Sequence, residues 1–250
     1  KKIQLMREGG AILSKILKEV GAMVKPGVGT QELDEYAEKR MIEEGGKPAF
    51  KNYVGDSKTP FPSTLCLSVN DEVVHGPATP NRVLKNGDVL SIDVGMKYKG
   101  YFTDMAATFN VGKIDKNAKK LIAVTNESLR IGLKKIKAGA ELNLMGKAIE
   151  DYAEKKKGFS VVRALAGHGV GKELHEAPMI LNYFEPSVNL EFTEGQTVAI
   201  EPMIVEGSDK VITAPDGWTV KTKDGGRAAH FEVTLAVTKK GFDILTPIFW

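Results

Sequence analysis

The stretch SIDVGMKYKGYFTD, residues 91–104, constrains the fold of this chain more than any other feature. It predicts two β-strands that fold back on each other at residues 98–100. With the turn centred between Tyr98 and Lys99, Asp93 and Asp104 would lie directly opposite each other, with Cβ atoms roughly 4.5–5.5 Å apart. Two carboxylates this close repel each other unless a cation or a shared proton lies between them. The hairpin therefore predicts a metal site or an acid–base site.

The alternative is that both aspartates are exposed strand residues with no functional role. The flanks argue against it, because the runs VLSI (89–92) and MAATF (105–109) are apolar, as is typical of a buried strand. Aspartate is almost never fully buried unless it is paired. The flanks therefore favour the interpretation as a functional site.

Length and composition bound the class of protein. A chain of 250 residues can form one large domain or two fused halves. The net charge of +3 gives no strong case for nucleic acid, and no apolar run approaches the roughly 18 residues that cross a bilayer. The N-terminal residues lack the apolar region of a signal peptide, and a single cysteine, Cys66, excludes an intrachain disulfide. We therefore expect a globular cytoplasmic protein that neither enters a membrane nor binds a specific nucleic acid.

The order of elements recurs along the chain. Apolar periodicity and turn residues predict helices over residues 4–24, 30–44, 118–137 and 143–157, as two pairs. The strings KPG (25–27) and KAG (137–139) align, and so do GDVLSID (87–93) and GQTVAIE (195–201). The repeat predicts one domain, residues 1–250, made of two pseudo-symmetric halves of about 1–112 and 113–250.

The repeat also aligns residues that carry chemistry. It places Glu201 where Asp93 lies and Glu232 where Asp104 lies, and the string VVH that ends at His75 resembles ELH, which ends at residue 175. Each half would supply one histidine and two carboxylates that converge about a pseudo-two-fold axis.

A further histidine, His168, lies in the glycine-rich string AGHGVG. One imidazole with four carboxylates suits Mn, Fe, Co or a pair of Zn ions and does not suit a structural zinc held by thiolates. About four negative charges would balance two divalent ions. The sequence therefore predicts a dinuclear metal site.

Six strings carry a resemblance that covers nearly the whole chain: NDEVVHG (70–76), IDVG with YFTD (92–104), GHGVGKELHEAP (167–178), AIEPM (199–203), DGWTVKTKD (216–224) and HFEVT (230–234). With these strings the chain resembles the methionine aminopeptidases of the shorter type (type I), within the pita-bread metallopeptidase family. The resemblance implies an α+β pita-bread fold, in which helices cover a curved, mostly antiparallel sheet.

The resemblance also implies roles for individual residues. The metal ligands would be Asp93, Asp104, His168, Glu201 and Glu232, with Asp104 and Glu232 bridging two divalent ions. The catalytic residues would be Glu201, which takes a proton from the attacking water, His175, which stabilises the tetrahedral oxygen, and His75, which bonds the scissile amide nitrogen. An apolar pocket for the methionine side chain would be formed by Phe61, Cys66, Leu174 and Trp218. His230, two residues before Glu232, is a candidate neighbour of the ligands.

The chain departs from the family pattern beside the ligands and in the pocket. Val233 follows the last ligand glutamate, where the family usually has histidine. Met105 and Ala106 follow the second aspartate, where the family usually has Asp-Thr-Ser or a similar string. In the pocket, Leu174 and Phe61 replace the phenylalanine and tyrosine that bacterial relatives often carry. The loop over residues 51–60 is a few residues longer than usual.

The implied function is removal of the initiator methionine from nascent proteins whose second residue is small. The partner would be the N-terminus of a peptide or nascent chain. A transient contact with the ribosome is compatible with this function. We expect the protein to be a monomer. Two alternatives stay open: a proline-specific peptidase of the same fold, and a binding module that kept the fold without the metal chemistry.

Overall fold

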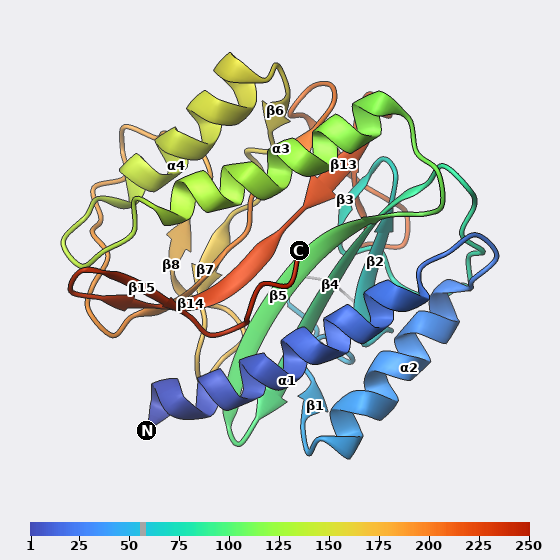
Figure 1. Cartoon of the computed structure of the whole chain (residues 1–250), viewed down its shortest axis with the longest axis horizontal. Helices are drawn as coiled ribbons and strands as arrows, with labels where there is room; N and C mark the ends of the chain where they lie inside the picture. Colours follow the sequence, from blue (N-terminus) through green and yellow to red (C-terminus); the bar gives the residue numbers. More distant parts are fainter. Residues whose placement is uncertain (56–58) are drawn as a thin grey trace.

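Helices and a large sheet form two layers in this computed structural model, which describes residues 1–55 and 59–250 (Figure 1). The helices are α1 (Lys2–Met23), α2 (Thr30–Glu43), α3 (Lys116–Leu133) and α4 (Leu142–Glu150), which continues as the π-helix η1 (Asp151–Lys156). They confirm the four predicted helices. No helix in the described ranges is long and apolar enough to cross a membrane.

The main sheet is antiparallel in every pairing and has the order β1-β4-β5-β14-β9-β7-β8, with β2 added to β4 and β15 added to β14. Two three-stranded sheets, β13-β10-β6 and β11-β12-β3, lie beside it. The strands are β1 (Lys47–Pro48), β2 (Leu65–Val69), β3 (Glu72–Val74), β4 (Val89–Tyr98), β5 (Tyr101–Asn110), β6 (Ser160–Val161), β7 (Gly167–Gly169), β8 (Glu176–Ile180), β9 (Thr197–Ile200), β10 (Met203–Val205), β11 (Val211–Thr213), β12 (Val220–Thr222), β13 (Ala228–His230), β14 (Glu232–Thr238) and β15 (Gly241–Ile244). This arrangement confirms the predicted α+β class with a mostly antiparallel sheet.

The two predicted repeats meet at the pairing of β5 with β14, in the middle of the main sheet. Glu232 lies opposite Ala106, and Val233 lies opposite Met105. Outward from this seam the sheet continues with β4 on one side and with β9 on the other, so the strands that carry the four aligned acids are neighbours. The division of the chain near residue 112 stays a prediction.

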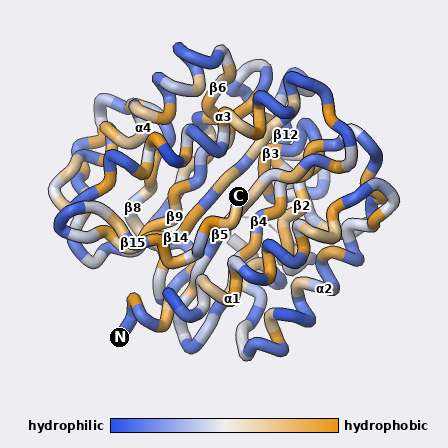
Figure 2. The backbone as a smooth tube through the Cα atoms, in the orientation of Figure 1, coloured by the Kyte–Doolittle hydropathy of each residue, from blue (hydrophilic) through white to orange (hydrophobic). Residues whose placement is uncertain are grey.

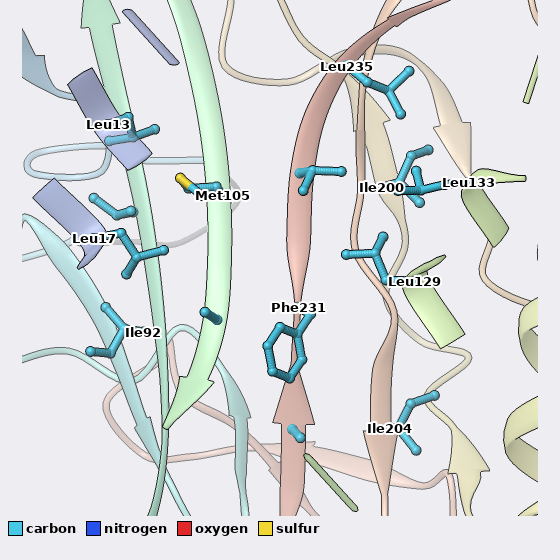
Figure 3. Packing of buried hydrophobic residues seen from close by; sticks show 14 of the residues in the cluster. Leu13, Leu17, Ile92, Met105, Leu129, Leu133, Ile200, Ile204, Phe231 and Leu235 are labelled. Atoms are coloured by element: carbon cyan, nitrogen blue, oxygen red, sulfur yellow. The ribbon is translucent and has the colours of Figure 1, made fainter. Parts of the chain in front are cut away.

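Alternation along the strands separates a core face from a polar face. Side chains of successive strand residues point to opposite faces. Ile92 and Met105 therefore face the helices, whereas Asp93 and Asp104 face away from them. Figure 3 shows the packed core, with these labelled residues: Leu13, Leu17, Ile92, Met105, Leu129, Leu133, Ile200, Ile204, Phe231 and Leu235. Each such side chain contributes about 1.5–3 kcal/mol by burial. The apolar strands lie inside and the hydrophilic helix turns outside (Figure 2).

The register of the central hairpin differs from the prediction by one residue at the turn. Tyr98 pairs with Tyr101, so the loop is Lys99-Gly100, with φ of 46° and 89°. Two-residue hairpin loops favour positive φ at both positions, and glycine adopts it readily, so the turn centres on this pair. Asp93 therefore lies opposite Ala106, and the prediction that it faces Asp104 directly was wrong. The two aspartates still share one face as diagonal neighbours.

The predicted extension of the loop over residues 51–60 lies partly outside the described residues, because it includes residues 56–58.

Candidate metal centre and substrate pocket

A cavity of about 490 Å³ opens on the polar face of the sheet. The structure brings the predicted metal ligands, the two predicted catalytic histidines and the four predicted pocket residues to this one cavity. Its lining includes Phe61, Cys66, His75, Asp93, Asp104, His168, Leu174, His175, Glu201, Trp218 and Glu232.

Four acids from neighbouring strands form one wall of the cavity. Asp93 comes from β4, Asp104 from β5 and Glu232 from the start of β14, while Glu201 directly follows β9. Asp104 is 3% exposed and Glu232 is 2% exposed. Burial raises the pKa of Asp93 and of Glu201 to about 7. Burial and the neighbouring carboxylates hold the pKa values of Asp104 and Glu232 well above their usual range. Carboxylates clustered in this way repel one another unless a cation or a shared proton lies between them.

The donor atoms of this wall fit a divalent metal. Asp93 Oδ1, Asp104 Oδ1 and Glu232 Oε1 are buried and accept no hydrogen bond from the described part of the chain. Asp104, His168 and Glu232 each place one donor atom within 4.8 Å of the others. Oxygen-rich sets with an imidazole suit Mn, Fe, Co and Zn. The residues present therefore fit a divalent-metal site, while the five-ligand set and the number of ions stay predictions.

His168 is fixed in the tautomer that a metal ligand needs. Its Nδ1–H donates to the carbonyl oxygen of Gly169 at 2.9 Å, which leaves a lone pair on Nε2, 3.5 Å from Glu201 Oε1. Burial lowers the pKa of His168 and keeps the ring neutral. The flanking glycines allow close approach of β7 to its neighbours, because a Cβ on Gly167 would lie 2.4 Å from the carbonyl oxygen of Ala199.

Two further histidines line the cavity beyond the acids. His75 follows β3 with φ of 60°, a left-handed conformation that is uncommon outside glycine, and burial lowers its pKa to about 4. The rings of His168 and His175 meet edge to face with centroids 4.4 Å apart. Burial also lowers the pKa of His175. His75 and His175 therefore line the same cavity as the acids, as neutral groups that can donate or accept a hydrogen bond.

The hydroxyl of Tyr53 lies 2.8 Å from His175 Nδ1, a contact that the sequence did not predict. Tyr53 falls in an irregular segment without periodicity, so no pattern in the sequence indicates where its side chain points. Phe50, Arg163 and Met203 also line the cavity and were not predicted.

The four predicted pocket residues come together. Phe61, Cys66 and Leu174 belong to one buried apolar cluster, against which Trp218 packs. The rings of Phe61 and Trp218 meet edge to face at 5.2 Å. Cys66 lies directly opposite Asp93 in the pairing of β2 with β4, so the apolar cluster adjoins the acids. Burial raises the pKa of the Cys66 thiol, which keeps the side chain neutral and apolar.

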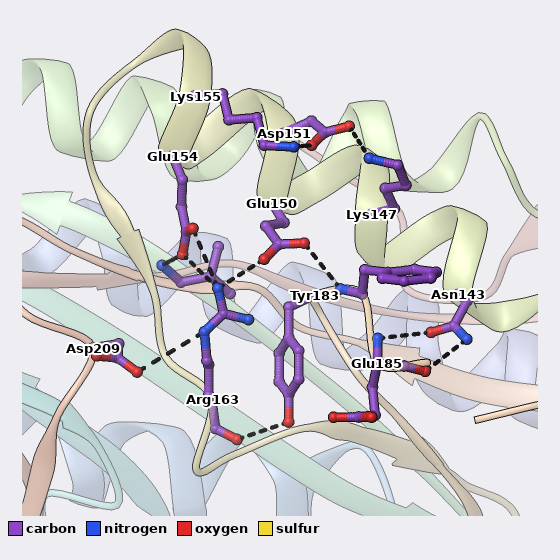
Figure 4. Close-up of polar contacts among 12 residues, drawn as sticks. Asn143, Lys147, Glu150, Asp151, Glu154, Lys155, Arg163, Tyr183, Glu185 and Asp209 are labelled. Atoms are coloured by element: carbon purple, nitrogen blue, oxygen red, sulfur yellow. Dashed lines mark hydrogen bonds and ion pairs between the residues drawn. The ribbon is translucent and has the colours of Figure 1, made fainter. Parts of the chain in front are cut away.

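A polar network holds the segment that leads to His168. The Arg163 guanidinium forms ion pairs with Glu150 and Glu154 at the end of α4 and in η1, and it lies over the ring of Tyr183 (Figure 4). Residues 163–167 line the cavity. Because several groups hold Arg163, the network fixes the wall next to His168.

This fold and this cluster of acids define the class as a metal-dependent hydrolase with a pita-bread architecture, and comparisons with known proteins agree. The profile of metallopeptidase family M24 matches residues 4–239. The chain is 46% identical to methionine aminopeptidase 1 of Bacillus subtilis over 99% of this chain and 97% of that protein. The chain therefore belongs to metallopeptidase family M24 and groups there with the methionine aminopeptidases.

Solved structures confirm the predicted fold. The crystal structure of methionine aminopeptidase from Thermotoga maritima has a TM-score of 0.93 at 40% identity and covers 99% of this chain and 97% of its own. Prolidase from Pyrococcus furiosus has a TM-score of 0.77 at 21% identity, and only 64% of its length is covered. At that identity the prolidase supports the fold alone.

Proposed function

We propose that this protein is a metal-dependent aminopeptidase that removes the initiator methionine from nascent proteins whose second residue is small. The observation that carries the proposal is the cross-strand pairing of Cys66 with Asp93, which sets an apolar pocket directly beside a cluster of buried acids. Such a cavity can hold an unbranched apolar side chain next to a peptide bond at a metal site.

Five side chains would hold the divalent metal that the family requires: Asp93, Asp104, His168, Glu201 and Glu232. We propose two ions, chosen among Mn, Fe, Co and Zn, because four carboxylates balance two divalent charges. When bound, such ions lower the pKa of a coordinated water toward about 7 and polarise a carbonyl oxygen.

The chain's own residues would bind the peptide and move protons. Glu201 would accept the proton of the attacking water. The Tyr53 hydroxyl can donate to His175 Nδ1, which leaves the proton on Nε2 for the oxygen that gains charge. His75, kept neutral by burial, would bond the scissile amide nitrogen.

The pocket sets the substrate. Phe61, Cys66, Leu174 and Trp218 would surround the flexible thioether side chain of methionine. Gly167 and His168 line the cavity and, with His75, would crowd the next residue of the peptide. A small second residue is therefore expected.

The two alternatives are less well supported. A proline-specific peptidase would share the metal ligands, but its similarity to this chain extends to the fold only. A binding module without metal would carry four clustered buried acids with no cation, an arrangement that costs stability.

The test uses three tripeptides with Mn or Co added. Met-Ala-Ser should be cleaved, whereas Met-Lys-Ser and Ala-Pro-Ser should not. Preferential cleavage of Ala-Pro-Ser would overturn the methionine specificity and leave the metal site standing. If protein shown to carry metal cleaved none of the three, the binding module would be favoured.

The cellular setting is part of the same proposal. We expect a cytoplasmic monomer that contacts the ribosome transiently, since its substrate would be the N-terminus of a nascent chain.

A further inference from the structure

We propose that His230 is a sixth metal-binding side chain, which shares an ion with Glu201 and Glu232. The proposal rests on the metal site of the proposed function and extends it beyond the five predicted ligands. His230 ends β13, is 1% exposed and forms, with Glu201 and Glu232, a group whose donor atoms all lie within 4.8 Å of one another.

The distances within this group fit donors around one ion. His230 Nε2 lies 3.4 Å from Glu201 Oε2 and 4.0 Å from Glu232 Oε2. Two donors bound to one ion at roughly 2.1 Å in tetrahedral geometry are about 3.4 Å apart. The imidazole and the two carboxylates therefore surround a point that one ion can occupy after small side-chain adjustments.

A simple hydrogen bond between His230 and Glu201 explains the geometry less well. An N–H donor to a carboxylate oxygen ordinarily lies about 2.7–3.2 Å away, which is shorter than the distance found here. Both ring nitrogens of His230 are buried, and neither has a hydrogen-bond partner in residues 1–55 or 59–250. A buried imidazole without partners is costly, and binding an ion removes that cost.

The backbone holds His230 in this position. Its N–H donates to Thr108 Oγ1 at 2.8 Å, and Thr108 Oγ1 donates to its carbonyl oxygen at 2.8 Å. Phe231, the next residue, belongs to the apolar core, so His230 and Glu232 flank it on the side of the acids. A ligand on such a rigid support is preorganised for an ion.

A second imidazole would change which metals bind well. Nitrogen donors suit Zn, Co, Fe and Ni, whereas Mn prefers oxygen. His230 should therefore favour Co over Mn relative to a site with His168 as its only imidazole.

The test counts metal-bound imidazoles in the Co-loaded protein by proton NMR after ¹⁵N labelling of histidine. Two strongly paramagnetically shifted ring N–H signals are expected in the unaltered protein, so the result does not depend on a variant folding. His230→Gln should lose one signal and reduce the affinity for Co relative to Mn by about tenfold or more. His175→Gln is the matched control, because this neighbouring histidine is not a proposed ligand, and it should keep both signals.

A single shifted signal that disappears in His168→Gln would overturn the role of His230 and leave the five-ligand site intact. The absence of any shifted signal in protein that contains Co would overturn the proposed metal site as well.

Discussion

The hydroxyl of Thr234 makes two hydrogen bonds to the backbone of Asp104. It accepts the N–H of Asp104 at 2.9 Å and donates to the carbonyl oxygen at 2.7 Å. The two residues lie on β5 and β14, the central strands of the sheet. A side chain on β14 thus holds the backbone of Asp104, which we propose as a bridging metal ligand.

Thr234→Val should therefore destabilise the protein and weaken metal binding. The substitution keeps the shape of the side chain but leaves the buried N–H and carbonyl of Asp104 without partners, at about 1–3 kcal/mol for each group. Urea denaturation should show a loss of roughly 2–6 kcal/mol in the free energy of unfolding. Thr125→Val is the matched control, because the Thr125 hydroxyl donates only to the Leu121 carbonyl within α3. An equal effect of the two changes would contradict the role of Thr234.

Asp104→Asn and Glu232→Gln should each abolish peptidase activity. Either change removes one negative charge from the acid cluster without changing its shape, so at least one ion should bind more weakly. Metal analysis after dialysis should show fewer than the two ions expected per unaltered chain. Full metal content in both variants would exclude these residues as bridging ligands.

His75→Ala should separate substrate contact from metal binding. His75 lines the cavity but does not belong to the groups of close donor atoms around Asp104 and Glu201. Turnover should fall by about 10²-fold or more, the size typical of a lost transition-state contact, while metal content is unchanged. Loss of metal from this variant would show that our division into ligands and substrate contacts is wrong.

The metal-free protein should lose stability as the pH rises through about 7. The folded-state pKa values of Asp93 and Glu201 are raised to about 7, against about 4 in an unfolded chain, so the folded state holds protons that the unfolded state has released. The contribution of these acids is thus present at low pH and lost as the pH rises. Near pH 6.5 the four histidines act in the opposite sense, because their folded-state pKa values are lowered and the unfolded chain releases their protons in this range. Asp104 and Glu232, whose pKa values are raised well above the usual range, add to the loss from Asp93 and Glu201, so the acids dominate.

Calorimetry of the metal-free protein at pH 6.5 and pH 8 should therefore give a lower melting temperature at pH 8. Bound divalent ions favour the ionised carboxylates, so the metal-loaded protein should not show this drop. A metal-free protein with the same melting temperature at both values would contradict the raised pKa values.

The sequence predicted the residues of the cavity better than their geometry. Buried acids such as Asp104 are rare enough in apolar strands to be read directly from the pattern. The register of the hairpin was not predictable in the same way, because it depends on which pair of residues adopts positive φ. Lys99 is not a residue for which that conformation is expected.

Tyr53 and Arg163 could not be predicted because their positions depend on tertiary packing. Tyr53 reaches a histidine that is 122 residues away in the sequence. Arg163 forms ion pairs with Glu150 in α4 and Glu154 in η1, and these ion pairs hold the segment that leads to His168. That segment has no sequence motif that would indicate them. Local patterns carry no information on contacts of this kind.

The seam between β5 and β14 also bears on how the active protein forms. Thr234 and Asp104 are 130 residues apart in the chain, so their contact closes a very large loop, and contacts of high sequence separation form slowly. Helix pairs and the β4–β5 hairpin can form before this closure, but the full set of acids cannot assemble until it is complete. Metal uptake should therefore follow the slowest long-range step of folding. The rate at which refolding protein takes up metal would then report the rate of that step.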